Sequence, residues 1–183
     1  MDTIRTKIRS LLNDNSTAMS DVFTYSNTSV FTVTEPNVIA ITDVYVNDVA
    51  SGVIHTYDTT LNKVTVSSSL TTGDTIQVDY TTYPNYSTTE LTSHVRAALV
   101  YLSINNYGEF LYDTDDDDIY PTLTDTEENL VAMIAALIID PDNRTIRLPD
   151  VTITNPTDVP TNVKISKTIA SFKRNSHRVF DII

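Results

Sequence analysis

The sequence has no cysteine and only three glycines, and both shortages exclude whole classes of chemistry. Without cysteine there can be no disulfide, thiolate metal site or cysteine nucleophile. Phosphate-binding loops and dinucleotide-binding turns need several glycines at fixed spacing, which Gly52, Gly73 and Gly108 do not provide. The nucleophile-elbow motif is also absent, and the three histidines fall on different expected elements. We therefore expect no catalytic residue, no cofactor and no metal, in a protein that is not an enzyme.

Long apolar runs are scarce as well. The longest, Leu130 to Ile139, has about half the length that a bilayer span requires. Residues 1–12 alternate charged and apolar side chains, a pattern unlike that of a signal peptide. We expect a soluble protein that is made in a cytoplasm and does not contact a membrane.

Positive charge is sparse and concentrated at the two ends. The net charge is −12; residues 1–12 carry +2 and residues 163–183 carry +4, so the body between them carries −18. An acidic body of this kind repels nucleic acid. The basic ends are therefore where an acidic partner would bind.

Two hydrophobic periods alternate along the chain. Residues 2–13 place apolar side chains at helical spacing, whereas residues 21–83 contain about six short runs rich in Val, Ile, Thr and Tyr, separated by Asn-, Asp- and Gly-containing turns. Helical spacing returns after Ser87, in two segments that open with the capping boxes Ser87-Thr-Thr-Glu90 and Thr124-Asp-Thr-Glu127. The first of these helices should end near Gly108, and the second should end at Asp140, before Pro141.

These periods predict an α+β fold with an insertion. We expect a small helical bundle made of residues 1–20 and 87–139, into which residues 21–86 insert an antiparallel β-sandwich or barrel-like module. Prolines at 141, 149, 156 and 160 then favour an extended arm over residues 140–162. A basic C-terminal helix should follow over residues 163–183.

The helix at 125–139 should be buried on every side, because Leu130 to Ile139 is apolar all round. In so small a protein, such burial suggests a contact with another subunit. The residues expected at this subunit interface are Leu130, Val131, Ile134, Leu137 and Ile138.

The last helix is expected to leave its own subunit and bind a partner through the arm, with its phenylalanines as apolar anchors and its cations for orientation. The partner-binding residues would be Lys164, Lys167, Phe172, Lys173, Arg174, Arg178 and Phe180. The alternative is a terminal helix that folds back and covers the subunit's own core.

Two local clusters allow more than one interpretation. Asp113, Asp115 and Asp117 alternate as in a calcium loop, but Asp118 replaces the required glycine, so an exposed loop held extended by charge repulsion is preferred. Three tyrosines end the β region and suggest either a sugar-stacking platform or, preferably, packing at the junction with the helices. These are Tyr80, Tyr83 and Tyr86.

One stretch resembles a known cassette. Residues 44–83, VYVNDVASGVIHTYDTTLNKVTVSSSLTTGDTIQVDYTTY, are similar to a β cassette common in virion proteins of tailed phages. The helices around the cassette resemble those of the head–tail connector, or adaptor, proteins of the phage neck. In that family a ring of subunits, usually twelve, sits below the portal, its helices form the ring, and its C-terminal segment docks on the portal.

The resemblance implies a structural virion protein. It would form a homo-oligomeric ring, dodecameric as is usual in that family, at the head–tail interface and would bind portal and tail or neck proteins. Genomic DNA would pass through without sequence-specific binding, and an acidic lining would limit sticking. The alternative is a phage fibre, head-decoration or glycan-binding β-domain protein, since the β cassette fits those proteins too.

Overall fold

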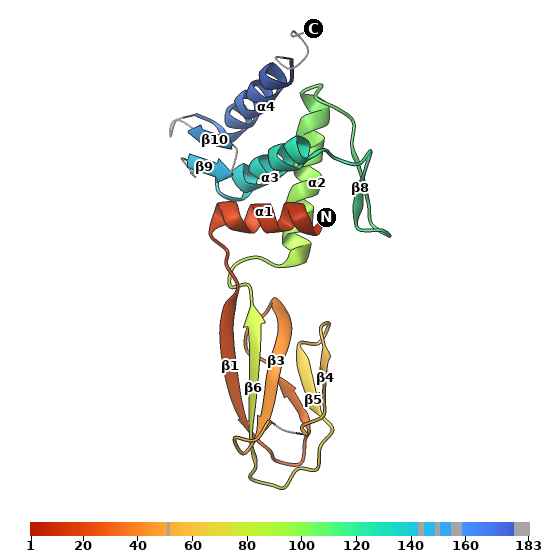
Figure 1. Ribbon diagram of the computed structural model, residues 1–183, viewed down its shortest axis with the longest axis vertical. Helices are drawn as coiled ribbons and strands as arrows, with labels where there is room; N and C mark the ends of the chain where they lie inside the picture. Colours follow the sequence, from red (N-terminus) through yellow and green to blue (C-terminus); the bar gives the residue numbers. More distant parts are fainter. Residues whose placement is uncertain (51, 143–144, 149–150, 155–158, 178–183) are drawn as a thin grey trace. The chain divides into compact units, whose positions relative to one another are not determined.

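The fold is α+β (Figure 1). The computed structural model describes residues 1–50, 52–142, 145–148, 151–154 and 159–177. Over these residues it has four helices and four small antiparallel sheets, none of which closes into a barrel. The chain divides into a helical unit, Met1–Asn13 with Thr88–Ile183, and a β unit, Asp14–Ser87. The β unit begins before the expected residue 21 because its first strand already begins at Thr17.

Six strands build the β unit. They are β1 (Thr17–Thr24), β2 (Val30–Thr32), β3 (Val38–Val46), β4 (His55–Asp58), β5 (Lys63–Val66) and β6 (Thr75–Thr82). One sheet has the order β1-β6-β3 and the other the order β2-β5-β4, and every pair is antiparallel. The six apolar runs in the sequence therefore predicted the strands correctly.

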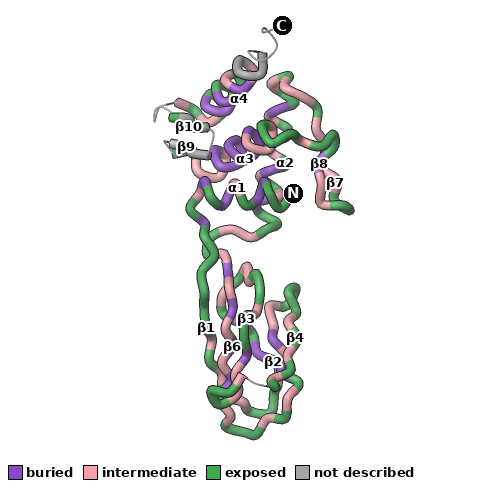
Figure 2. Tube along the Cα trace, in the orientation of Figure 1, coloured by how far each residue is buried: buried purple, intermediate pink, exposed green. Residues whose placement is uncertain are grey.

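Alternation along β6 places its apolar side chains in the core of the β unit. Ile76, Val78 and Tyr80 are buried, whereas the residues between them are only partly buried. They share one core with Val44 of β3 and Val64 of β5, so both sheets contribute to it (Figure 2). Tyr80 is thus a core residue of the β unit and not a residue of the sheet–helix junction.

Several expected turns contain Asn or Asp residues with positive φ. Asn47 and Asp48 both have positive φ (49° and 67°), the geometry of a tight hairpin turn that Asn and Asp tolerate. The Asn47 side chain also accepts from the Thr75 N–H at 2.9 Å and donates to Asp74 at 2.8 Å. Asn27, Asn37 and other turn residues adopt the same left-handed region.

The helical unit is centred on one apolar helix. Its elements are α1 (Asp2–Leu12), α2 (Thr88–Ile104), β7 (Leu111–Asp113), β8 (Asp118–Tyr120), α3 (Asp125–Ile139), β9 (Thr145–Leu148), β10 (Val151–Thr154) and α4 (Thr161–His177). The predicted capping box opens α3, since Thr124 accepts from the Glu127 N–H and Glu127 accepts from the Thr124 N–H. Helices α1, α2 and α4 all pack against α3 (Figure 1). None of the described helices is long and apolar enough to span a membrane.

The expected extended arm is wrong where the structure describes it. Strands β9 and β10 pair antiparallel with each other, with Leu148 opposite Val151, because two paired extended segments satisfy each other's backbone groups. This strand pair returns the chain toward the end of α3, where the Lys164 Nζ donates to the Pro141 carbonyl at 2.5 Å. The chain therefore folds back instead of reaching outward.

Candidate interaction surface on the helical unit

Helix α2 has one buried and one exposed apolar face. Leu91, Val95 and Leu102 are fully buried. Val100 and Ile104, one turn apart on another face, are 57% and 69% exposed. An exposed aliphatic pair at i, i+4 makes this face a candidate contact surface.

Asn106, and not Gly108, ends α2. Its φ is 53°, its N–H donates to the Ser103 carbonyl at 2.9 Å, and the Tyr107 N–H donates to the Leu102 carbonyl at 2.9 Å. This bonding pattern closes the last helical turn, and Asn is the usual substitute for glycine in it. Gly108 has a different role: a Cβ there would lie 2.8 Å from the Phe110 ring, so its absence leaves room for that ring.

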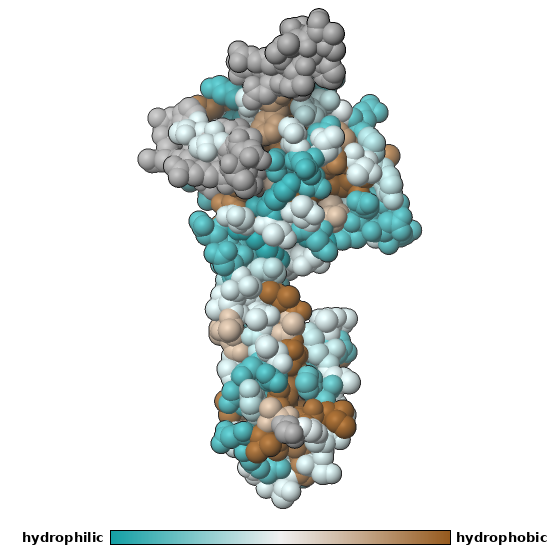
Figure 3. Space-filling model, viewed as in Figure 1, coloured by the Kyte–Doolittle hydropathy of each residue, from teal (hydrophilic) through white to brown (hydrophobic). Residues whose placement is uncertain are grey.

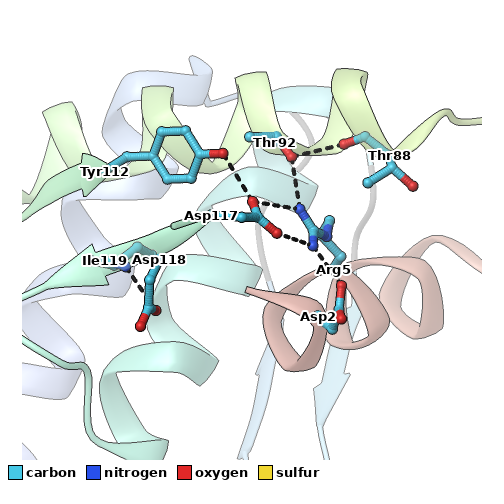
Figure 4. Close-up of polar contacts among 8 residues, drawn as sticks. All are labelled: Asp2, Arg5, Thr88, Thr92, Tyr112, Asp117, Asp118 and Ile119. Carbon is cyan, nitrogen blue, oxygen red and sulfur yellow. Dashed lines mark hydrogen bonds and ion pairs between the residues drawn. The ribbon is translucent and has the colours of Figure 1, made fainter. Parts of the chain in front are cut away.

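The acidic run forms the turn of the β7–β8 hairpin, which a buried arginine holds against the helices (Figure 4). The Arg5 guanidinium donates from Nη1 to the Asp117 Oδ1 at 3.0 Å and from Nη2 to its Oδ2 at 2.5 Å. Nη1 also donates to the Thr92 hydroxyl at 3.1 Å, and the Tyr112 hydroxyl donates to the Asp117 Oδ1 at 2.9 Å. We call Arg5, Thr92, Tyr112 and Asp117 the Arg5 cluster; it connects α1, α2 and the hairpin.

The Arg5 cluster corrects part of the expectation of an exposed, charge-extended loop. Asp115 and Asp116 are exposed as expected, but Asp117 and Asp118 are half-buried. The bidentate pair with Arg5 compensates the charge of Asp117 that would otherwise repel its neighbours. The Arg5 hydrogen bond is the main cause that lowers the pKa of Asp117 below its ordinary value. The hydrogen bond to the Asp117 carboxylate raises the pKa of Tyr112. Across the described part of the chain, no three acidic or histidine side chains are grouped as metal ligands.

The hairpin and α2 enclose an apolar groove of about 390 Å³, here called the α2–β7 groove. It is lined by Arg96, Leu99, Val100, Ser103, Ile104, Phe110, Leu111 and Tyr112. Leu111 is 76% exposed, so it adds a third large aliphatic to Val100 and Ile104. Hydrophobic surface is visible in Figure 3 between α2 and the hairpin on the right of the helical unit.

Arg96 adds a single cation to this apolar groove. Its Cζ lies 5.7 Å from the centre of the Tyr112 ring, in cation–π range, and the residue is exposed. The groove can therefore accept an apolar peptide that carries a carboxylate. The groove was not predicted from the sequence, although Val100 and Ile104, which lie off the buried face of α2, were a detectable signal.

The subunit-interface prediction is wrong for the core of α3. Leu130, Val131, Ile134 and Leu137 are 0% exposed within a single chain, and Ile138 is half-buried. Helix α3 is buried on all sides as predicted, but α1, α2 and α4 of the same chain provide the cover. The four fully buried side chains are therefore not available to another subunit, whereas Ile138 keeps part of its surface exposed.

Three of the seven predicted partner-binding residues, Lys164, Phe172 and Lys173, are engaged within the chain. Ile165, Ile169 and Phe172 form the buried face of α4, which packs on α3, so the alternative of a helix folded back is the correct one. Lys164 is buried, and Lys173 Nζ donates to the Asn105 and Asn106 carbonyls at 2.8 and 3.0 Å.

The remaining predicted partner residues divide into two groups. Lys167 is exposed on α4. Arg174 lies in α4, whereas Arg178 and Phe180 lie outside the described residues.

The histidines and a hollow in the β unit do not form further sites of the expected kinds. His55, His94 and His177 lie on β4, α2 and α4, three separate elements. The β unit has an open hollow of about 400 Å³ on the outer face of the β1-β6-β3 sheet, where Asp43 and Asp79 lie opposite each other. Tyr80 lines this hollow, but the Tyr80 residue is only 1% exposed. Its ring therefore offers no stacking platform for a sugar.

The sequence matches no protein-family model, and no curated protein matches it.

Proposed function

We propose that this chain is a structural virion protein of a tailed phage, a subunit of the neck ring that joins the portal of the capsid to the tail. The observation that carries the proposal is the α2–β7 groove. Three large aliphatic side chains lie exposed beside one another on a helical unit whose own core is already complete. Surfaces of this kind mark protein–protein contacts.

A neck ring would account for the helices, the inserted β unit and the acidic charge together. Its helices would form the ring, with the α2–β7 groove in place of α3 as the contact between copies. The layout that motivated the resemblance, a β unit inserted between two helices that share one unit, also fits such a protein. The acidic body would let genomic DNA pass through the ring without sticking.

The portal contact is proposed to involve the exposed part of α4. Lys167 is the predicted partner residue that remains exposed there, and a cation on an acidic protein speeds encounter with an acidic surface. Portal binding by this helix is measured by co-sedimentation of the purified chain with portal rings, and Lys167→Glu should weaken it.

Native mass spectrometry and negative-stain microscopy of the purified chain test the ring. The expected result is a closed homo-oligomer, which the double variant Val100→Asp/Ile104→Asp should abolish without unfolding the chain, since both side chains are exposed. The matched control is Val163→Asp, because Val163 is an exposed aliphatic on α4 outside the groove. A monomer would contradict the ring, and a trimer would favour the fibre or decoration alternative.

A further inference from the structure

The α2–β7 groove specifies the chemistry of its occupant. Its sides are aliphatic and aromatic, with Val100, Ile104 and Leu111 exposed, and its single charged residue is Arg96. From Arg96 to Ile104 the helix rises about 12 Å at ~1.5 Å per residue. The groove therefore fits a short apolar segment with one carboxylate among its side chains.

The chain carries a segment of this description. Residues 178–183 read Arg-Val-Phe-Asp-Ile-Ile, four apolar side chains with Asp181 among them. They lie outside the described residues and follow directly on α4, which ends at His177. Six residues span up to about 20 Å when extended, which exceeds the length of the groove.

The position of α4 indicates which copy of the groove this segment meets. The Lys173 Nζ of α4 donates to the Asn105 and Asn106 carbonyls. These carbonyls directly follow Ile104, the last residue of α2 that lines the groove. Helices α2 and α4 run toward the same end of the helical unit (Figure 1). The described part of α4 is therefore directed past the C-terminal end of α2 and not back along the groove of its own copy.

We propose that residues 178–183 of one copy occupy the α2–β7 groove of the adjacent copy, with Asp181 paired to Arg96. This inference rests on the proposed ring and names its intersubunit contact. Since a tail and a groove are different surfaces, the contact is heterologous, and repetition of a heterologous contact with a closing rotation gives a ring. Val179, Phe180 and Ile182 would supply the apolar contacts, and the Asp181–Arg96 pair would set the register.

Complementation between two variants tests the proposal. A chain ending at His177 keeps the groove and lacks the segment, whereas full-length Val100→Asp/Ile104→Asp keeps the segment and lacks the groove. Neither should assemble alone, and an equimolar mixture should give a one-to-one heterodimer in native mass spectrometry. Full-length Val163→Asp, the control, should still form the closed oligomer.

A peptide of residues 178–183 gives a second, independent readout. It should bind the chain ending at His177 and should fail to bind the same chain carrying Val100→Asp/Ile104→Asp, as measured by fluorescence anisotropy. Replacement of Asp181 by Asn in the peptide, or Arg96→Gln in the chain, should weaken binding roughly 3- to 10-fold, because each removes one charge-assisted contact.

The outcomes separate this proposal from the ring itself. If the chain ending at His177 still forms the full ring, the segment is not the contact, although the ring stands. If the full chain is monomeric while the peptide binds the shortened chain, the segment fills its own groove and both the ring and the exchange between copies are wrong. If the peptide does not bind, the occupant has been misidentified whatever the assembly state.

Discussion

At the scale of single residues, Arg5 determines how the hairpin is attached to the helices. Its side chain is only 10% exposed and its guanidinium binds Asp117 with two hydrogen bonds, while Asp2 pairs with it from the exposed side. A buried cation that loses its carboxylate keeps the desolvation cost without the compensating bonds. Asp117 therefore matters more to stability than its neighbours in the acidic turn.

Asp117→Asn should destabilise the helical unit by about 1–2 kcal/mol at neutral pH, because the hydrogen bonds to the buried Arg5 lose their charge. Urea unfolding measures the change. Asp115→Asn is the control, since it removes the same charge from an exposed position of the same turn and should leave the midpoint nearly unchanged.

The effect of Asp117→Asn should depend on pH in a defined direction. The folded-state pKa of Asp117 lies below its ordinary value of 3.8, with the Arg5 hydrogen bond as the main cause. The carboxylate contribution is therefore complete above pH 3.8 and is lost as the pH falls through the lowered pKa. Wild type and variant should converge in acid, and a difference that persisted there would show that the loss is not ionic.

In the β unit, Tyr80 is a buried polar side chain whose hydrogen bonds contribute to stability. Its hydroxyl donates to the Asp21 Oδ2 at 3.1 Å and accepts from the Glu35 N–H at 3.4 Å, and the ring is 1% exposed. Burial raises the pKa of Tyr80 to about 12. The side chain should thus remain protonated in the folded β unit under conditions that ionise an exposed tyrosine.

Tyr80→Phe should cost about 1 kcal/mol of β-unit stability at neutral pH through the lost hydrogen bonds. Since the folded pKa exceeds the ordinary value of 10, wild type should lose stability between pH 10 and about 12, a loss that the variant lacks. Denaturant unfolding across that range checks both effects. Tyr45→Phe, on the opposite face of β3 from Val44, should leave the neutral-pH stability nearly unchanged; an equal loss there would remove the special role of Tyr80.

At the scale of elements, the sequence of α3 shows that the helix must be buried but does not show which helices cover it. Eight successive residues, from Leu130 to Leu137, are fully buried, and no polar residue interrupts them. An isolated helix of this composition must be covered, but three helices of one chain or a second chain can provide the cover equally well. Here α1, α2 and α4 provide it.

Ile134→Ala should therefore destabilise the folded chain itself, by about 2–5 kcal/mol, because it leaves a cavity in the core of the helical unit. The measurement is denaturant unfolding at several protein concentrations. The loss should be independent of concentration, since the cavity is internal to one chain. A loss that shrank as concentration rose would instead place Ile134 at a contact between subunits.

At the scale of the whole molecule, the chain consists of two units with separate cores. The core of the β unit contains only residues from between Phe23 and Tyr80. The core of the helical unit is built from α1, α2, α3 and α4, although the β unit separates α1 from α2 in sequence. The β unit is therefore a complete structure inserted into another.

Residues 14–87 should fold when produced alone and should unfold cooperatively, because their core needs no residue from outside the β unit. Circular dichroism during urea titration measures the transition, and Tyr80→Phe should shift it as it does in the full chain. A fragment without a cooperative transition would show that the β unit depends on the helices.

The sequence by itself determined the elements, because their signals are local. Val, Ile, Thr and Tyr runs between Asn turns predicted β1 to β6, and Thr124 with Glu127 predicted the start of α3, since capping and turn geometry involve residues only a few positions apart. Only the tertiary structure decided the contacts. Packing between distant segments decides whether Leu130 and Phe172 face their own chain or another. It also brings Arg5 to Asp117, more than a hundred residues away in the sequence. The α2–β7 groove is of the same kind, because Val100 and Leu111 become one surface only when the hairpin lies against α2.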